Sequence, residues 1–325
     1  MKKILVTGGA GYIGSIMTNR LLDEEYEVVV VDSLEKGYRD SVPQKATLVV
    51  GNLLDDGFVS KLFNDHEFDG VMHFAAYISM GESMQLPSKY FSNNVQTAVH
   101  LLDAMAKHSV TRFIFSSTAG VYGNPTHVPI PETHVTKPTN PYGESKLIVE
   151  QMLRWYGEIH GISHVILRYF NAAGALVDGS MGEVHTPETH IIPSAIKASL
   201  KGDTFDLYGT DYATDDGTAV RDYIHVLDLA EAHILALNHL VDHKGRFIYN
   251  VGTGKGYSNK EVVDMVKKVS GQPLTLNEKP RRPGDADVLV ADATRIKEEL
   301  SFSPQSSDLE TIVKTAWEFH KKHNS

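Results

Sequence analysis

The chain has 325 residues, of which 42% are hydrophobic and 22% are charged, and its formal net charge at pH 7 is -10. This composition is typical of a globular protein that is large enough for two domains. The negative charge argues against a protein that binds nucleic-acid phosphates, and the lack of cysteine excludes disulfides, thiolate nucleophiles and Cys-ligated zinc. No apolar run approaches the roughly 20 residues of a membrane-spanning helix.

A glycine-rich turn follows the first predicted strand. The strand covers residues 4–6, the sequence T-G-G-A-G-Y-I-G covers 7–14, and a helix and a second strand at 27–31 come next. The glycines permit a tight turn and let a pyrophosphate approach the helix N-terminus. Asp32, at the end of the second strand, is placed to accept hydrogen bonds from the ribose hydroxyls of NAD and would repel the 2′-phosphate of NADP. This context predicts an NAD site rather than a turn without a ligand.

Strands and helices continue to alternate up to about residue 170. Strands are predicted at 47–50, 71–74, 112–116 and 164–169, and helices at 88–107 and from about 141 onward. Such alternation predicts a parallel sheet that helices cover on both faces, with ligands bound beyond the carboxyl ends of the strands. The polar and glycine positions that follow the strands are therefore expected to meet at one edge of the sheet.

The pattern changes from about Leu176. Gly and Pro interrupt short apolar segments, an aspartate-rich loop is predicted at 202–217, and helices are predicted at 258–269 and 311–320. We predict an α/β protein with a Rossmann-type doubly wound parallel sheet and a smaller mixed α/β C-terminal lobe that binds substrate. The expected NAD-binding domain is 1–175, with a segment at about 220–255 returning to it, and 176–325 mainly forms the second lobe.

The sequence N-P-Y-G-E-S-K places Tyr142 four residues before Lys146. If a helix begins near Pro141, both side chains lie on one face of its first turns. An ammonium group next to a phenol favours the phenolate, so we expect the pKa of Tyr142 to be lowered. Such a tyrosine can take a proton from an alcohol and return it. This spacing alone more often marks a surface pair, and the glycine turn is what favours the catalytic interpretation.

These motifs together resemble the extended short-chain dehydrogenase/reductase family. The resemblance rests on T-G-G-A-G-Y-I-G, Asp32, H-F-A-A (73–76), S-S-T (116–118), Y-G-E-S-K (142–146) and R-Y-F-N-A-A-G (168–174). Three later segments are similar, in order and spacing, to the UDP-sugar 4-epimerases of that family: D-G-T-A-V-R-D-Y-I-H-V-L-D-L-A (216–230), Y-N-V-G-T-G (249–254) and P-R-R-P-G-D (280–285). The resemblance extends to about residue 300.

The resemblance implies a catalytic base, a supporting cation and a hydroxyl that binds the sugar 4-hydroxyl. These roles carry over to Tyr142, Lys146 and Thr118 respectively. It also implies an NAD site formed by Gly8, Gly11, Tyr12, Ile13, Gly14, Asp32, Asn52, Leu53, Phe74, Ala75, Ala76, Asn93, Ser116, Tyr142, Lys146 and Tyr169. Two positions depart from the family pattern. Asn52 stands where an acid commonly contacts adenine, and Ile78 replaces a lysine that some members place near the pyrophosphate.

A UDP-sugar site is implied in the same way. By resemblance, Asn171 binds the diphosphate region, Arg221 and Arg282 neutralise the phosphates, Asp285 meets the uridine ribose, and Tyr208 lies against uracil. The full expected set of substrate contacts is Thr118, Tyr142, Asn171, His190, Ile191, Tyr208, Arg221, Arg282, Asp285 and Leu289. Leu289 stands where some relatives carry a bulkier tyrosine beside the 2-substituent of the sugar. It leaves more space, so an N-acetylated hexosamine is a second expected substrate.

The implied reaction interconverts UDP-glucose and UDP-galactose, as in galactose metabolism, by transient oxidation at C4 with bound NAD. A UDP-pentose 4-epimerase remains an alternative, because the motifs specify UDP better than the C6 group of the sugar. A non-catalytic NAD-binding sensor is a further alternative, although such proteins typically lose the catalytic Tyr or Lys. A net dehydrogenase would instead produce stoichiometric NADH. A 4,6-dehydratase is disfavoured, because Ala119 and Gly120 stand where those relatives carry an acid and a base.

We expect no metal site among the sixteen histidines. The pairs His160/His164 and His239/His243 are spaced by four residues, but neither has a glutamate at metalloprotease spacing.

The expected partners are a UDP-sugar and, by resemblance, a second copy of the chain. The helices at 88–107 and after Tyr142 would form the interface of this homodimer. No nucleic acid or membrane is expected to bind. The apolar run at 4–6 is too short for a signal peptide, so we predict a cytoplasmic protein.

Overall fold

A computed structural model describes residues 2–282 and 285–323 of the chain. The contacts divide the chain into two compact units. The first comprises Met1–Gly123, Val135–Tyr169 and Ala230–Tyr249, and the second comprises Asn124–His134, Phe170–Leu229 and Asn250–Ser325. Within the described ranges, no helix combines the length and the apolar character that a membrane crossing requires.

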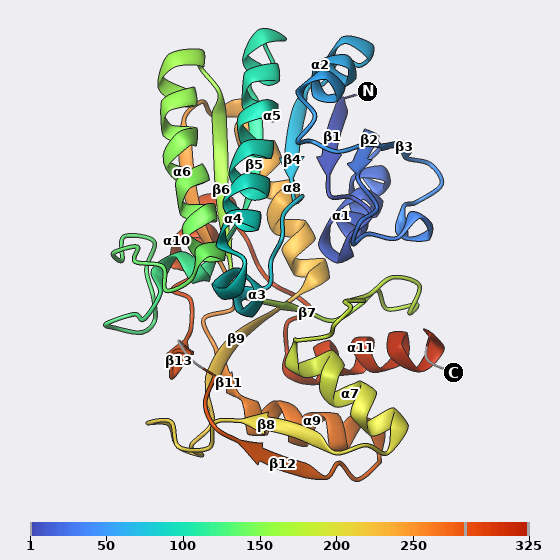
Figure 1. Cartoon of the computed structure of the whole chain (residues 1–325), viewed down its shortest axis with the longest axis vertical. Helices are drawn as coiled ribbons and strands as arrows, with labels where there is room; N and C mark the ends of the chain where they lie inside the picture. The colour runs from blue at the N-terminus through green and yellow to red at the C-terminus, as the bar shows by residue number, and fades with distance from the viewer. Residues whose placement is uncertain (1, 283–284, 324–325) are drawn as a thin grey trace. The chain divides into compact units, whose positions relative to one another are not determined.

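The first unit contains a sheet of seven strands in the order β10-β6-β5-β4-β1-β2-β3 (Figure 1). Its strands are β1 (Lys3–Thr7), β2 (Glu27–Asp32), β3 (Thr47–Val50), β4 (Gly70–His73), β5 (Arg112–Thr118), β6 (Ser163–Tyr169) and β10 (Arg246–Val251). The pairs that join β1 through β6 are all parallel. Strands β1, β2, β4 and β6 are apolar and buried along nearly their whole length, as expected where helices cover both faces.

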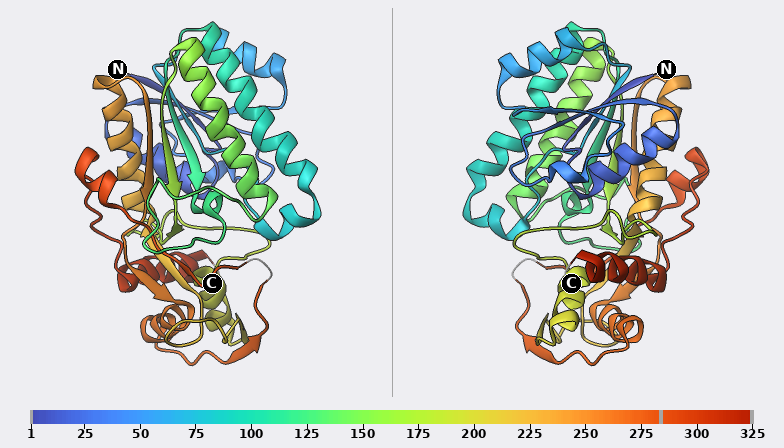
Figure 2. Two further views of the ribbon diagram at one scale, coloured as in Figure 1. Left: turned by 90° about the vertical axis from the view of Figure 1, so that its left-hand side faces the viewer. Right: turned by 90° about the vertical axis from the view of Figure 1, so that its right-hand side faces the viewer.

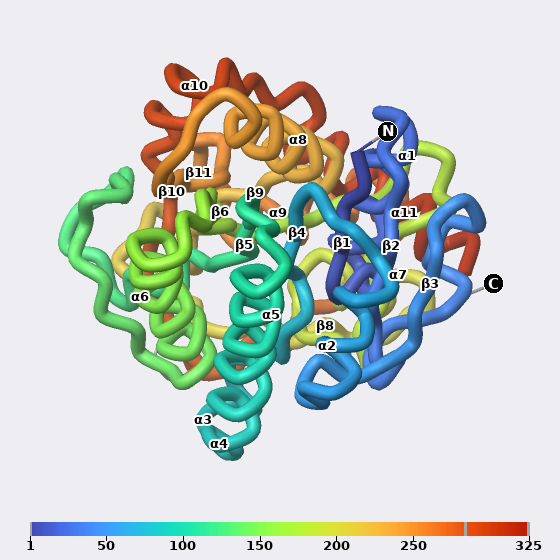
Figure 3. Tube along the Cα trace, turned by 90° about the horizontal axis from the view of Figure 1, so that it is seen from above, coloured from blue at the N-terminus to red at the C-terminus, as the bar shows by residue number. Residues whose placement is uncertain are grey.

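Helices cover the two faces of this sheet, as Figure 3 shows from above. Helices α2 (Asp56–Asp65), α5 (Gln96–Lys107) and α6 (Pro141–His160) bury their apolar faces in one core with β1, β2, β4, β5 and β6. Helices α1 (Tyr12–Asp23) and α8 (Val226–Asp242) lie on the opposite face. The predicted fold class, with its doubly wound parallel sheet, is confirmed.

The helical stretch predicted at 88–107 is helical throughout but is not one α-helix. It consists of α4 (Pro87–Tyr90), a short π-helix (Phe91–Val95) and α5, and the short α3 (Met80–Gln85) precedes it. A π-helical turn within an α-helix adds a residue to that turn and redirects side chains, often at functional positions. Here, the amide group of Asn94 accepts a hydrogen bond from the Tyr77 backbone (2.9 Å) and donates to the Ser145 hydroxyl (3.0 Å).

The second unit contains a four-stranded sheet and a two-stranded sheet. The first sheet consists of β7 (Asn171–Ala173), β9 (Val220–His225), β11 (Gly256–Ser258) and β13 (Val288–Leu289), and the second consists of β8 (Phe205–Tyr208) and β12 (Leu276–Lys279). Helices α7 (Ile191–Lys201), α9 (Asn259–Ser270) and α11 (Leu309–His323) pack together, as Figure 2 shows, and share an apolar core with β8 and β9.

Three short helical segments complete the described parts of the chain. They are α10 (Thr294–Leu300) in the second unit and two 3₁₀-helices, Arg39–Ser41 and Ala119–Tyr122, in the first.

The bounds of the two units differ in detail from the expected domain division. Residues 220–229 group with the second unit, because β9 pairs with β7, β11 and β13. Residues 230–249 group with the first unit, where β10 lies beside β6. Which unit binds cofactor and which binds substrate stays a prediction.

Candidate active site

The glycine turn connects β1 to α1 and brings backbone segments too close together for side chains at two of its positions. Gly8 has a φ of +72°, and a Cβ atom on it would lie 2.6 Å from the backbone nitrogen of Ala75. A Cβ atom on Gly14 would lie 2.3 Å from the Gly8 carbonyl oxygen. Gly11 precedes α1 with no side-chain cap, so the first amides of that helix face outward for an anion. Larger residues would close this cradle.

Asp32 lies at the end of β2, next to the glycine turn. Its carboxylate accepts hydrogen bonds from the backbone amides of Ala10 (3.0 Å) and Leu34 (2.8 Å). These contacts fix the Asp32 carboxylate beside the glycine turn, where the ribose hydroxyls of NAD are expected. The cradle and the acid therefore fit NAD. Gly8, Gly14 and Asp32 thus have the arrangement of the strand, glycine turn, helix, strand and acid by which Rossmann-type folds bind NAD.

The adenine-side candidates Asn52 and Leu53 follow β3. The Asn52 side chain accepts a hydrogen bond from the Leu54 amide (2.9 Å), which fixes the turn. The Leu53 side chain is buried in the core, and the His100 ring contacts its carbonyl oxygen (2.8 Å). Leu53 can therefore offer a ligand its backbone and not its side chain.

The residues after β4 lie on the other side of the glycine turn. The ring of Phe74 lies 5.0 Å, centroid to centroid, from that of His233. His233 also pairs with the Tyr169 hydroxyl, so this α8 residue connects two predicted cofactor contacts. The predicted contact Asn93 donates to the Asn94 side chain (3.0 Å). Sequence reasoning missed His233 and Asn94, because their roles depend on partners more than fifteen residues away.

The three catalytic candidates come together at the end of β5. The Thr118 hydroxyl accepts a hydrogen bond from the Gly120 amide (3.0 Å) and hydrogen-bonds the Tyr142 phenol. Tyr142 lies in the first turn of α6, which Asn140 caps by accepting from the Gly143 amide. The Lys146 ammonium donates to the Ser116 carbonyl oxygen at 2.7 Å. The structure thus brings Tyr142 and Lys146 of α6 together with Thr118 at the end of β5.

The electrostatics of this group differ from the sequence prediction. Burial raises the pKa of Tyr142 to about 12, and the Thr118 hydrogen bond offsets only part of that rise. Burial also lowers the pKa of Lys146 to about 7, against the attraction of Glu150. The expected lowering of the tyrosine pKa is therefore wrong for this chain by itself. The Lys146 ammonium donates to a backbone oxygen, and the desolvation of the buried phenol is the largest effect on the Tyr142 pKa.

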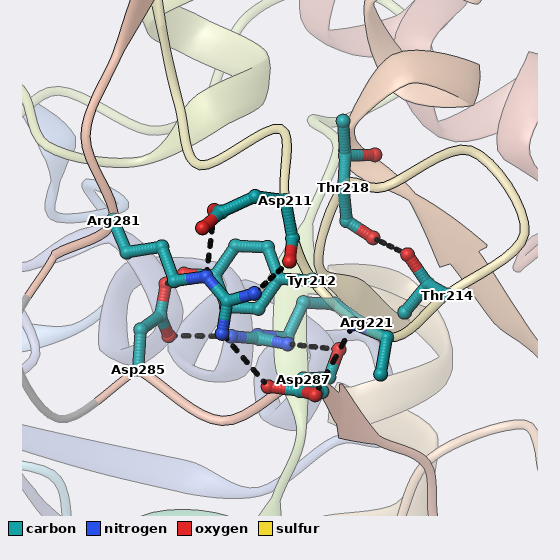
Figure 4. Close-up of polar contacts among 9 residues, drawn as sticks. Asp211, Tyr212, Thr214, Thr218, Arg221, Arg281, Asp285 and Asp287 are labelled. Atoms are coloured by element: carbon teal, nitrogen blue, oxygen red, sulfur yellow. Dashed lines mark hydrogen bonds and ion pairs between the residues drawn. The ribbon is translucent and has the colours of Figure 1, made fainter.

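The expected phosphate and ribose ligands of the second unit form an ion pair, shown in Figure 4. Arg221 of β9 pairs with Asp285 and also donates to the Val220 carbonyl oxygen (2.8 Å). Asp285 accepts from the Tyr212 hydroxyl at 3.4 Å. The structure thus joins two residues to which the resemblance gave separate roles. Asn171, in β7, pairs in register with Tyr223 of β9 and so lies in the same sheet as Arg221.

Residues that the sequence did not suggest support this pair. Arg281 donates to the Asp211 carboxylate (2.7 Å), lies 3.7 Å from the Asp287 carboxylate, and covers the Tyr212 ring at 4.1 Å (Figure 4). The next residue, Arg282, covers the ring of Tyr208 at 4.3 Å. The two adjacent arginines therefore each lie over a tyrosine. Each arginine is distant from its tyrosine in the sequence, so no local pattern could have suggested these contacts.

The remaining substrate candidates are also placed. Leu289 in β13 pairs in register with Arg221, and so it lies next to the Arg221–Asp285 pair. His190 precedes α7, and Ile191 is the first residue of that helix. Attraction to Glu183 raises the pKa of His190 to about 9. The largest electrostatic interaction of His190 is therefore the one with the Glu183 carboxylate.

Comparisons with known proteins give the family. Residues 4–252 match the sequence profile of the NAD dependent epimerase/dehydratase family. The chain is 45% identical to the UDP-glucose 4-epimerase of Lactobacillus helveticus, over 99% of this chain and 98% of that protein. The chain therefore belongs to the NAD dependent epimerase/dehydratase family.

Two solved structures agree with this assignment. The UDP-glucose 4-epimerase of Brucella ovis in complex with NAD has a TM-score of 0.94 and 42% identity, with 98% of each chain covered. That of Bifidobacterium longum in complex with NAD+ and UDP has a TM-score of 0.94 and 37% identity, with 99% of each chain covered. The recognition made from the sequence, the NAD cofactor and the class of NAD-dependent UDP-sugar 4-epimerase are confirmed.

Proposed function

We propose that the chain interconverts UDP-glucose and UDP-galactose by transient oxidation at C4. The observation that carries this proposal is the meeting of Tyr142, Lys146 and Thr118 at the end of β5. This arrangement disfavours a non-catalytic sensor, because each group that the proton transfer needs is in place. The relatives favour UDP-hexoses over UDP-pentoses.

Each member of the catalytic group has a defined task in this proposal. Thr118 holds the sugar 4-hydroxyl and the phenol of Tyr142 together. Tyr142 accepts the proton of the 4-hydroxyl and later returns it to the product. Lys146 supplies a positive charge that favours the phenolate when it is protonated. NAD, when bound, supplies the acceptor for the C4 hydride.

The residues that contact NAD stay a prediction. Gly8, Gly11 and Gly14 would hold the pyrophosphate, and Asp32 would hold the adenosine ribose. The geometry that supports this proposal is the tight backbone turn at Gly8 and Gly14 and the fixed carboxylate of Asp32.

The UDP moiety would be anchored by residues of the second unit. Arg221 and Arg282 would neutralise the phosphates, and Asp285 would accept hydrogen bonds from the uridine ribose. Asn171 and Tyr208 would complete the anchor at the diphosphate and at uracil. Because the binding energy comes mainly from the UDP moiety, the 4-keto hexose is free to turn over between hydride loss and hydride return. The further activity on UDP-N-acetylhexosamines is proposed because the leucine at position 289, which pairs in register with Arg221, is smaller than the tyrosine of some relatives.

The direct test gives the purified protein UDP-galactose without added NAD. We expect UDP-glucose to form while NADH absorbance does not accumulate, because the hydride returns to the sugar. Tyr142→Phe removes the group that moves the proton and should lower kcat by about 10²- to 10⁴-fold. Stoichiometric NADH that appears only after NAD is added would instead identify a net dehydrogenase.

We also propose a homodimer. Helix α6 carries Trp155 and Ile159, which are 52% and 68% exposed, and α3 carries the exposed Met80 and Met84. Each of these helices thus exposes two large apolar side chains, and exposed apolar surface is typical of an interface. The cytoplasmic location expected from the sequence stays a prediction.

A further inference from the structure

Four potential metal ligands converge just before α7. Glu183, His185, Glu188 and His190, which we call the Glu183–His190 cluster, each direct one ligand atom inward, and these atoms all lie within 4.8 Å of one another. All four come from eight consecutive residues. Such a short chelating loop needs little ordering of distant chain segments to form a site.

The centre of the cluster is the carboxylate of Glu183, whose side chain is only 5% exposed. Its Oε1 atom lies 2.9 Å from His185 Nδ1 and also contacts His190 Nδ1. The imidazoles of His185 and His190 thus each contact the buried Oε1 atom of Glu183 through their own Nδ1 atom. A buried carboxylate requires either charged partners or a metal ion.

Glu188 is oriented by its own neighbours. One of its oxygens accepts hydrogen bonds from the amides of Thr189 (3.0 Å) and His190 (3.2 Å), and the other pairs with the Lys197 ammonium at 3.0 Å. Outer contacts of this kind commonly hold the ligands of a metal site in place. The Oε1 atom of Glu188 lies 4.0 Å from His185 Nδ1.

We propose that the Glu183–His190 cluster binds one divalent first-row transition-metal ion of the zinc class. Two imidazole nitrogens and two carboxylate oxygens match the ligands that zinc takes, whereas Mg²⁺ and Ca²⁺ prefer oxygen ligands alone. Four protein ligands leave no open position, so the site is structural and not catalytic. Ligand atoms about 2 Å from zinc are roughly 3.4 Å apart in a tetrahedral site. The widest separation in the cluster, at most 4.8 Å, therefore needs to shorten, and the His185–Glu183 contact of 2.9 Å needs to lengthen.

The ion would fix the entrance to α7. His190 is the N-cap residue of that helix, yet its side chain makes no capping hydrogen bond. As a metal ligand, His190 would tie the first turn of α7 to the loop at 183–188. This assigns His190 a role that differs from the uridine contact expected from the resemblance. The inference does not depend on the proposed reaction, because its readout is bound metal.

The test is zinc binding by the full chain after dialysis against a chelator. Titration calorimetry, together with elemental analysis after gel filtration, should give one Zn²⁺ per chain, with no displacement by excess Mg²⁺. His185→Ala and Glu188→Gln should each weaken zinc binding by about 10-fold or more. Zinc should also raise the melting temperature of the wild type more than that of either variant.

A matched control removes a different histidine pair. The rings of His127 and His134 lie 4.7 Å apart outside the cluster, so the double variant His127→Ala/His134→Ala should keep the stoichiometry and affinity of the wild type. Circular dichroism without zinc checks that each variant folds. If His185→Ala fails this check, Glu188→Gln and the anomalous signal of a zinc-soaked wild-type crystal decide the question. Wild-type protein that binds no zinc, or zinc binding that none of the cluster variants alters, would overturn the proposal.

Discussion

At the scale of single residues, Leu289, which pairs in register with Arg221, is the residue proposed to leave space for the 2-substituent of the sugar. We expect the wild type to convert UDP-N-acetylglucosamine as well as UDP-glucose. Leu289→Tyr should lower kcat/KM for the N-acetylated sugar about 10-fold or more relative to UDP-glucose, because steric discrimination of this kind spans about 10- to 200-fold. Val288→Ile, which enlarges the preceding strand residue, serves as the control. Equal losses with both sugars, or a wild type that does not turn over the N-acetylated sugar, would contradict this expectation.

Lys146 connects protein stability to pH. Because burial lowers its pKa to about 7 in the folded chain, the unfolded chain binds one more proton at this lysine between about pH 7 and pH 10.5. The Lys146 contribution to the free energy of unfolding therefore rises with pH across that window, by at most about 1.4 kcal/mol per pH unit. Lys146→Met should remove this dependence. Urea unfolding of cofactor-free protein at about pH 7 and about pH 10 measures it.

The quantity to compare is the difference in the free energy of unfolding between the wild type and Lys146→Met at each pH. This difference isolates Lys146, because the other titrating groups are present in both proteins. The wild type should gain stability relative to Lys146→Met as the pH rises. A difference that stays constant over the window would show that Lys146 keeps its proton in the folded chain.

The sequence predicted the helix that carries Tyr142 and Lys146 better than the energetics of these two side chains. The helix predicted to begin near Pro141 does begin there. The predicted lowering of the tyrosine pKa was wrong because the burial that raises this pKa depends on contacts that the spacing does not reveal. The Arg221–Asp285 pair was not predicted either, because these residues are 64 positions apart and meet only after the second unit folds.

At the scale of elements, a buried ion pair fastens α6 to the sheet beneath the catalytic group. Arg168 of β6 donates to both oxygens of Glu150 of α6, at 2.6 and 3.1 Å. Ser117 of β5 donates to the same carboxylate at 2.5 Å. The three elements that carry or flank Tyr142 and Thr118 are therefore joined through one carboxylate.

Glu150→Ala should lower the free energy of unfolding by about 3–5 kcal/mol, because it leaves the Arg168 guanidinium buried without its partner. The exposed Glu158, two turns further along α6, provides the control, and Glu158→Ala should change stability by less than about 0.5 kcal/mol. Urea unfolding monitored by circular dichroism distinguishes the two. Equal effects of both substitutions would mean that the buried pair does not hold α6 in place.

The order of the elements in the first unit could be predicted, because buried parallel strands and amphipathic helices have distinct sequence periods. The π-helix at 91–95 could not be predicted, since it depends on the hydrogen bonds of Asn94 to Tyr77 and Ser145. The short strands of the second unit were also unclear in the sequence. Strands β7, β11 and β13 have two or three residues each, which is too few to show a period.

At the scale of the whole molecule, the curated relative and the two solved structures extend over nearly the full length of this chain. The chain nevertheless divides into units whose segments alternate along the sequence. Residues 124–134, for example, group with the second unit, where the Asn250 side chain donates to the Ile130 carbonyl oxygen (2.8 Å). Such a contact, across 120 residues, cannot be read from local sequence.

The predicted homodimer depends on the exposed apolar surface of α6. Trp155 and Ile159 are four residues apart, so their side chains are neighbours on the helix surface. Trp155→Glu combined with Ile159→Glu would place two carboxylates in the interface, where their desolvation is unfavourable, and should yield a monomer. Light scattering after size-exclusion chromatography would give the mass of each species. Val177→Glu, at an apolar residue that is 75% exposed elsewhere, should remain a dimer, and a monomeric wild type at micromolar concentration would refute the prediction.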